Sequence, residues 1–236
     1  HRFTPMDLQY ALRTNGAVRS FKDKPVGLDI VAAILDDARF APSGGNGQPW
    51  RVAVVEDRPL RRGLADLMQP VWDEYLEIRM AGGQPYTVVG YETPDNITPG
   101  KPNELLDNIE SIPVVLAIAA DLGKIAMMDA DLERPPMTGG GSIYPFCWNL
   151  MLSARHRGLG GVMTTFLSRR EPEAAGLLGL PKDHALVATI FLGHPVKQLT
   201  RLRREPVESF AAIDRFDGAP LHSPPNRPDL TGKWQK

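Results

Sequence analysis

The residues with the clearest chemical potential occupy positions 41–51, in the order Ala-Pro-Ser-Gly-Gly-Asn-Gly-Gln-Pro-Trp-Arg. Three glycines let main-chain amides come close to a ligand, because no Cβ stands in the way. Ser43, Asn46 and Gln48 add donors and acceptors that suit the polar edge of a flat heterocycle. The same composition is common in solvent-exposed connectors, so an ordinary surface loop is the alternative interpretation.

Two basic groups lie far apart in the sequence. Arg19 follows a predicted helix end and is expected in an extended segment. A second group, near the other end of the chain, comprises Arg201, Arg203 and Arg204. A guanidinium can form a bidentate pair with a phosphate, whereas a surface ion pair is the alternative for each arginine. If the fold brings the two groups together, they would enclose a phosphate.

Signatures of other catalytic classes are missing from the sequence. It contains no Gly-x-Ser-x-Gly elbow, no spaced His/Cys metal set, no P-loop and no complete Gly-x-Gly-x-x-Gly fingerprint. His156, His184 and His194 are scattered over a predicted helix, strand and turn, so structural or surface roles are expected. Cys147 lies in an apolar helical pattern, where a free cysteine is usually a small apolar filler. We therefore expect no catalytic side chain and no metal ligand.

Hydrophobic periodicity predicts the elements that position these residues. A helix at 29–40 should end in the polar loop, and an apolar helix at 143–157 should begin behind Ser142 as its N-cap. Pro70 is expected to bend or break a long amphipathic stretch at 59–78. Further helices are predicted from Thr4 as N-cap to residue 14, at 123–132 and at 168–178, and strands at 51–56, 112–119, 162–166 and 184–192.

Length and composition limit the class of protein. With 236 residues, 42% hydrophobic and 23% charged, the chain is expected to form one core domain and to be neither disordered nor a membrane protein. The longest apolar run, at 112–120, is too short to cross a bilayer. A net charge of -1 provides no general attraction to nucleic acid. The lone Cys147 cannot form an intrachain disulfide and no secretory signal is visible, so a cytoplasmic location is expected.

Four stretches, taken together, resemble the FMN-dependent nitroreductase family. Residues 42–50 are similar to its Pro-Ser-x-x-Asn-x-Gln-Pro-Trp segment, and residues 18–26 to its early Arg-containing segment. Residues 149–165 resemble its central helix and the strand that meets the flavin ring. Residues 192–206 resemble its C-terminal strand and basic tail. The matches occur in the family's order and together span about residues 13–210.

The resemblance implies an α+β protein with a mostly antiparallel central sheet flanked by helices, and an interlocked homodimer with FMN at the subunit interface. It implies that Arg19 and the C-terminal arginines neutralise the phosphate, and that main-chain amides near Thr164 and Thr165 meet the N5 and O4 edge of the flavin. Residues 42–46 would come from the partner subunit. The cofactor-binding residues implied in and beside that stretch are Pro42, Ser43, Gly44, Asn46 and Gln48.

The sequence departs from the family at positions 15–17, where Asn-Gly-Ala replaces the common Arg and Ser. Fewer phosphate ligands could weaken FMN binding, unless Arg13 or another basic residue compensates. The expected domain is a single FMN-binding unit at 1–217, followed by a Pro-rich tail at 218–236. A Gly- and Pro-rich excursion at about 81–103 is expected to shape substrate entry.

The reaction implied by the resemblance is hydride transfer from NAD(P)H through FMN to an electron-poor acceptor, such as a nitroaromatic or a quinone, in a ping-pong cycle. Two alternatives keep the flavin but change its use. One is an FMN-binding sensor or storage protein without turnover. The other is a related flavin-dependent dehalogenase or flavin-cleaving enzyme, because a fold does not determine a reaction.

Overall fold

The structure, a computed structural model, describes residues 6–224. Its centre is a four-stranded antiparallel sheet with the strand order β1-β2-β4-β3. The strands are β1 (Trp50–Val54), β2 (Val114–Asp121), β3 (Gly160–Thr164) and β4 (His184–Gly193). The four predicted strands are therefore confirmed to within two residues, and β1 and β3 form the two edges of the sheet.

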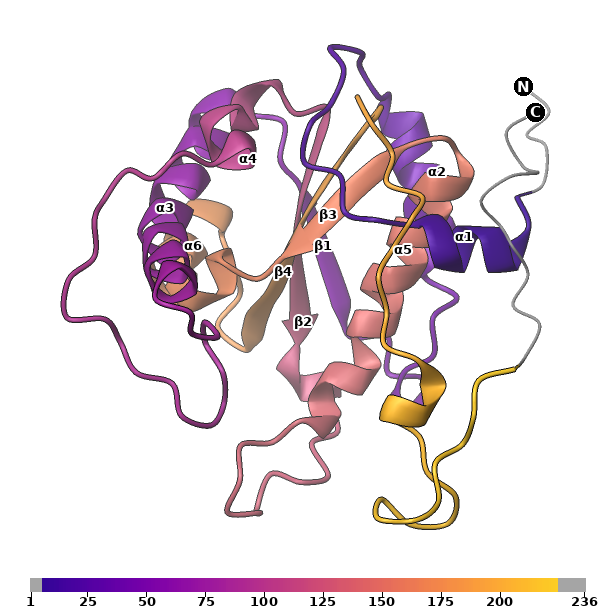
Figure 1. The fold of residues 1–236 in the computed structure, drawn as a ribbon. Helices are drawn as coiled ribbons and strands as arrows, with labels where there is room; N and C mark the ends of the chain where they lie inside the picture. Colours follow the sequence, from indigo (N-terminus) through magenta and orange to yellow (C-terminus); the bar gives the residue numbers. More distant parts are fainter. Residues whose placement is uncertain (1–5, 225–236) are drawn as a thin grey trace.

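Helices cover both faces of the sheet (Figure 1), with α3, α4 and α6 on one face and α2 and α5 on the other. The α-helices are α1 (Leu8–Thr14), α2 (Leu28–Ala38), α3 (Arg58–Met80), α4 (Glu104–Asp107), α5 (Tyr144–His156) and α6 (Glu171–Leu178). Short 3-10 turns are η1 (Gly44–Asn46), η2 (Ile109–Ser111), η3 (Leu122–Lys124), η4 (Thr138–Ser142), η5 (Leu167–Arg170) and η6 (Val207–Ser209). The expected α+β architecture is confirmed. None of the described helices is both long enough and apolar enough to cross a membrane.

Strand β2 lies at the centre of two hydrophobic cores. Leu116 and Ile118 pack into the core formed with α2 and α5, whereas Val115 and Ala117 pack into the core formed with α3 and α6. Side chains alternate across a strand, so a strand buried on both faces needs a nearly continuous apolar sequence. This explains why the apolar run at 112–120 predicted a strand correctly.

The buried Arg61 ties α3 to the sheet. Its Nε donates to the carbonyl oxygen of Val55 at 2.7 Å, and its Nη1 donates to the carbonyl oxygen of Ile112 at 2.6 Å. These carbonyl groups come directly after β1 and just before β2, where the sheet ladder does not pair them. Burial lowers the pKa of the guanidinium. Arg61 therefore fixes the end of the sheet at which α3 begins.

Three local predictions differ from the structure. The first helix begins at Leu8 with Asp7 as its N-cap, and Thr4 lies outside the described residues. Pro70 does not break α3, which continues through this residue, because packing of its apolar face against the core outweighs the one missing backbone hydrogen bond. The helix expected at 123–132 is wrong, since only η3 forms there. The carboxylate of Asp129 instead accepts backbone hydrogen bonds from the far side of the loop.

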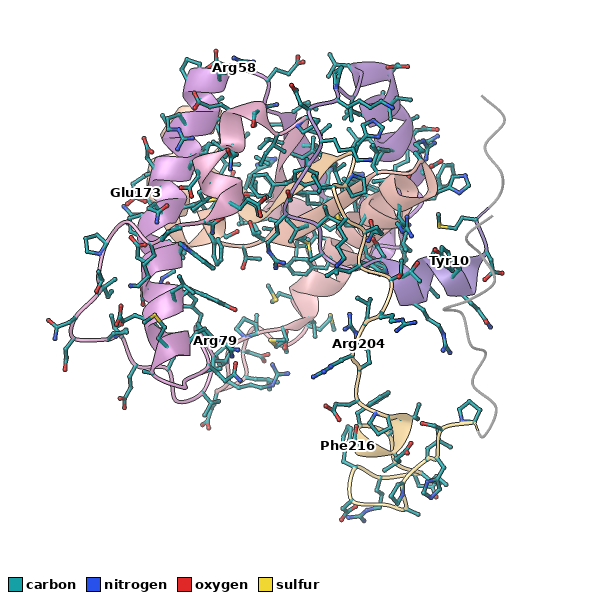
Figure 2. The ribbon with its side chains drawn as sticks, turned by 45° about the horizontal axis from the view of Figure 1, so that its top comes forward. Tyr10, Arg58, Arg79, Glu173, Arg204 and Phe216 are labelled. Atoms are coloured by element: carbon teal, nitrogen blue, oxygen red, sulfur yellow. The ribbon has the colours of Figure 1, made fainter. Side chains whose placement is uncertain are left out.

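The C-terminal part forms a small folded unit beyond the main body. Ala212 pairs with Pro220, and the Ser223 hydroxyl donates to Glu208 at 2.7 Å. Figure 2 shows Phe216 in this unit, away from the sheet, and its side chain is fully exposed. Residues 225–236 of the expected tail lie outside the described residues.

Candidate functional site

Residues 42–48, called the ligand loop below, have a defined backbone shape. Three residues of the loop have positive φ angles: 57° at Gly45, 53° at Asn46 and 48° at Gln48. The Ser43 hydroxyl accepts a hydrogen bond from the backbone N–H of Gln48 at 3.0 Å and closes the loop. Pro42, Asn46 and Gln48 are exposed. The loop is therefore shaped from within, and it presents its polar groups to solvent.

A second segment, residues 122–142, supports the ligand loop. The Ser142 hydroxyl accepts a hydrogen bond from the Gly44 N–H at 3.0 Å. On the other side, a Cβ at Gly47 would lie only 2.9 Å from the Lys124 carbonyl oxygen. The expectation that Ser142 caps α5 is therefore wrong, because the N-cap is Ile143 and makes no side-chain cap. No local pattern could have revealed a contact between residues 98 positions apart.

The segment that carries Arg19 lies beside the sheet at the end where β3 begins. The Val18 N–H donates to the Gly161 carbonyl oxygen at 2.8 Å, and the Lys22 N–H donates to the His194 carbonyl oxygen at 2.8 Å. Between these two anchors, Arg19 is exposed and lines a cavity of about 430 Å³. The cations around this cavity are Arg19, Lys22 and Arg58, and its acids are Asp23 and Glu104. Within residues 6–224, no ion pair involves Arg19.

The C-terminal arginines lie on a segment that packs against the Arg19 segment. Gln198 Nε2 donates to the carbonyl oxygens of Thr14 and Gly16, at 3.3 and 3.2 Å. A Cβ at Gly16 would come within 2.7 Å of the Leu199 Cβ, so no larger residue fits at that position without a shift. The exposed arginines that follow are Arg201, Arg203 and Arg204. The structure therefore places residues 194–199 beside residues 14–22, and the three C-terminal arginines come after this contact. None of the three lines the Arg19 cavity, and Figure 2 shows Arg204 where the chain leaves the main body.

The end of β3 is open on its outer edge. Val18 pairs with this strand at Gly161, near its start, whereas Met163 is 37% exposed and Thr165 is exposed. The Thr164 hydroxyl is buried, and within the described part of the chain it has no hydrogen-bond partner. A buried unpaired hydroxyl is uncommon and is consistent with a partner supplied by a ligand.

The ligand loop and the Arg19 segment lie in separate places in one chain. The ligand loop lies where β2 ends and β4 begins, since the Asp121 N–H donates to the Pro49 carbonyl oxygen. The segment that carries Arg19 lies at the opposite end of β4, beside β3 at the opposite edge of the sheet. At 3.2–3.4 Å per residue, the ten-residue β4 alone separates them by about 30 Å. This distance exceeds the length of an FMN molecule.

Cys147 is not an activated nucleophile. Burial raises the pKa of the Cys147 thiol to about 12, and the residue is 0% exposed, so it is an inert core residue as expected. Partial burial lowers the pKa of His194, and the nearby Lys24 and Lys22 act in the same direction. The cations around the Arg19 cavity suit binding of a polar, anionic ligand.

Comparison with known proteins identifies the family. The model of the Nitroreductase family matches residues 13–194. A nitrobenzene nitroreductase of Ectopseudomonas oleovorans is 29% identical over 201 residues, which cover 77% of this chain and 84% of the relative. A 5,6-dimethylbenzimidazole synthase of Rhodospirillum rubrum is 29% identical over 190 residues, which cover 78% and 82%.

A solved structure has the same fold. The NADPH:FMN oxidoreductase from Vibrio harveyi, complexed with NAD+, superimposes with a TM-score of 0.63 at 20% sequence identity and covers 87% of this chain and 76% of its own. The chain therefore belongs to the nitroreductase family. It is an oxidoreductase, and the family resemblance inferred from the four sequence stretches is confirmed.

Proposed function

We propose that this protein binds FMN and transfers hydride from NAD(P)H to an electron-poor acceptor, such as a nitroaromatic or a quinone, in a ping-pong cycle. The observation that carries the proposal is that Arg19, on the segment beside the start of β3, makes no ion pair within residues 6–224, while the other end of the same strand is open. When bound, FMN would supply the redox chemistry by accepting a hydride and then passing electrons to the second substrate.

The residues present fit such a cofactor. Arg19 and the C-terminal arginines Arg201, Arg203 and Arg204 would neutralise the phosphate, because their side chains are exposed and the segment that precedes the C-terminal arginines packs against the Arg19 segment. The amides near Thr164 and Thr165 can donate to the N5 and O4 edge of a flavin at the open end of β3, where hydrogen bonds would stabilise the reduced ring. The Thr164 hydroxyl is available as a further partner there.

A second copy of the chain completes the site in this proposal. One chain holds the ligand loop about 30 Å from Arg19, so the loop of one subunit would reach the flavin bound by the other. A two-fold axis would then create two identical sites, each with contributions from both subunits. The loop residues that would contact the flavin are Pro42, Ser43, Gly44, Asn46 and Gln48.

The excursion at 81–103 is proposed to shape substrate entry. It is fastened to α3, where the Asp73 carboxylate accepts from the backbone N–H groups of Gly100 and Lys101, both at 2.8 Å. It also reaches the segment that follows β3, because the Arg169 guanidinium lies 4.6 Å from the centre of the Tyr86 ring. A cavity of about 660 Å³ lies between α3, residues 97–99 and residues 169–173. The excursion therefore lies close to the segment that leaves the open strand end.

Named relatives support the choice of substrates and cofactor. The Bacillus subtilis FMN reductase [NAD(P)H], 25% identical over 209 residues, supports use of NAD(P)H and flavin. The Ectopseudomonas relative supports a nitroaromatic acceptor. A cytoplasmic location is proposed from the single, buried and unpaired Cys147.

The experiment that tests this function is an absorbance spectrum of the purified protein, followed by anaerobic addition of NADPH or NADH. We expect a yellow protein that bleaches, and whose colour returns when a nitroaromatic or quinone is added. Yellow protein that does not bleach with either nucleotide would refute the reductase function in favour of flavin binding without turnover. Colourless protein that cannot be loaded with FMN would refute the proposal altogether.

A further inference from the structure

We propose that Ser142 is a positioning residue for FMN binding, acting through the ligand loop. The inference rests on the proposed function, because it assumes that the ligand loop contacts FMN. Ser142 is 6% exposed, and its hydroxyl accepts the hydrogen bond from the Gly44 N–H at 3.0 Å. A Cβ at Gly44 would lie 3.3 Å from this hydroxyl oxygen, so the loop backbone is in direct contact with Ser142.

The Ser142 hydroxyl does not cap the helix that follows it. A serine before a helix usually caps the helix N-terminus, but α5 starts behind Ile143 without any side-chain cap. The hydroxyl of Ser142 instead holds a loop that precedes it by 98 residues. Ser142 therefore contributes to the shape of the ligand loop rather than to the start of the helix.

The position of Ser142 is itself fixed by a cluster of hydrogen bonds within the 122–142 segment. The buried carboxylate of Asp129 accepts from the Met137 N–H at 2.9 Å and from the Thr138 hydroxyl at 2.6 Å, and Thr138 opens the turn that ends at Ser142. A Cβ at Gly139 would come within 2.6 Å of the Met127 Cε, so the two sides of this segment pack closely. The segment that supports the ligand loop is therefore itself held in place by hydrogen bonds and close packing.

The loop needs this support because of its backbone conformation. Asn46 and Gln48 both have positive φ angles, which non-glycine residues rarely adopt and keep only when their surroundings impose them. Without the Ser142 contact, the loop would spend part of its time in other conformations. FMN would then bind more weakly, because only the competent fraction can contact it.

The test compares Ser142→Ala with a matched control, Ser153→Ala. Ser153 is also a buried serine, and its hydroxyl donates to Asp37 at 2.7 Å and accepts from Arg157 at 2.6 Å, but it lies on α5 away from the ligand loop. Dissociation constants for FMN are measured by titrating apoprotein and following flavin fluorescence, and the melting temperature of each apoprotein is measured in parallel.

Ser142→Ala should raise the FMN dissociation constant about fivefold, which corresponds to the net value of one hydrogen bond, about 1 kcal/mol. Ser153→Ala should lower the melting temperature but leave the dissociation constant within twofold of wild type. An unchanged constant for Ser142→Ala, or an equal rise in both variants, would overturn the inference. A wild-type protein that binds no FMN would instead refute the proposed function.

A measurement on the wild-type protein covers the case in which Ser142→Ala does not fold. Hydrogen exchange of the Gly44 amide, followed by NMR, should be slower than in a free peptide of residues 41–51, because Ser142 accepts its hydrogen bond. Exchange at the rate of the peptide would show that the contact does not persist in solution, and it would overturn the inference.

Discussion

Dimers assembled from two different variants can show whether each site is built from two chains. Arg19→Glu reverses the charge at the proposed phosphate position, and loss of one charged hydrogen bond alone weakens binding by about 1.5–3 kcal/mol. Asn46→Val places a β-branched residue at a φ of 53°, which costs about 1–3 kcal/mol in the ligand loop. Each substitution should therefore lower FMN occupancy in its own homodimer.

The expected occupancy of a mixed dimer follows from the separation of the half-sites. Arg19 and the ligand loop are about 30 Å apart in one chain, so each flavin would be held by Arg19 of one subunit and the loop of the other. In a dimer of an Arg19→Glu chain and an Asn46→Val chain, both defects fall in one site and the second site is intact. We expect such a dimer to bind about half of the wild-type amount of FMN.

The assay uses two affinity tags, one on each chain, so that only the mixed dimer is purified, and bound FMN is counted by absorbance. The matched control is a dimer of a doubly substituted chain and a wild-type chain. If each site is shared, this dimer has one defect in each site and should bind little FMN. The reverse result, with little FMN in the first dimer and half in the control, would refute the shared site, because it requires both half-sites to come from one chain.

Three further predictions concern the described contacts. Arg61→Met should lower the free energy of unfolding by about 2–5 kcal/mol in denaturant titrations, because two buried carbonyl groups lose their donors. Arg62→Met, at a partly exposed neighbouring position, should lower the free energy of unfolding by less than about 0.5 kcal/mol, and equal losses in the two variants would contradict this reasoning. Hydrogen bonds from Thr138 and Met137 hold the pKa of Asp129 below its ordinary 3.8, so the stability they provide is present above that pH and is lost as pH falls. The difference in melting temperature between wild type and Asp129→Asn should therefore shrink below about pH 4, and a constant difference would contradict it. Cys147, with its pKa near 12, should react with an aromatic disulfide reagent only after unfolding, whereas rapid reaction of the folded protein would contradict its burial.

Elements held by local patterns were predictable from the sequence. The run at 112–120 predicted β2 because a strand between two cores must be apolar on both faces. Helix α5 was predicted by its apolar periodicity. The helix at 123–132 was not, because the carboxylate of Asp129 binds backbone groups eight and nine residues further along the chain. Hydrophobic periodicity does not reveal that a side chain will bind backbone groups in place of helical hydrogen bonds, so it cannot predict that the helix is absent.

The parts of the candidate site were predictable, but their arrangement was not. The ligand loop and Arg19 stand out by composition and by resemblance, since glycine, amide and guanidinium groups have recognisable chemistry. The support by Ser142 connects residues 98 positions apart, and its hydroxyl has an equally plausible local use as a helix cap. Only the folded chain shows which of the two uses the hydroxyl has.

Position 16 shows how packing can change the meaning of a sequence departure. Gly16 stands where the family commonly has a larger polar residue, and from the sequence alone this suggests a lost phosphate ligand. In the structure, a Cβ there would meet Leu199 at 2.7 Å and Leu202 at 2.8 Å. A side chain at position 16 would therefore push away the segment that carries Arg201 and Arg203. We infer that glycine at position 16 lets the segment with Arg201 and Arg203 pack against residues 14–16. The residue that replaces a polar family position therefore also brings two other arginines close to that position.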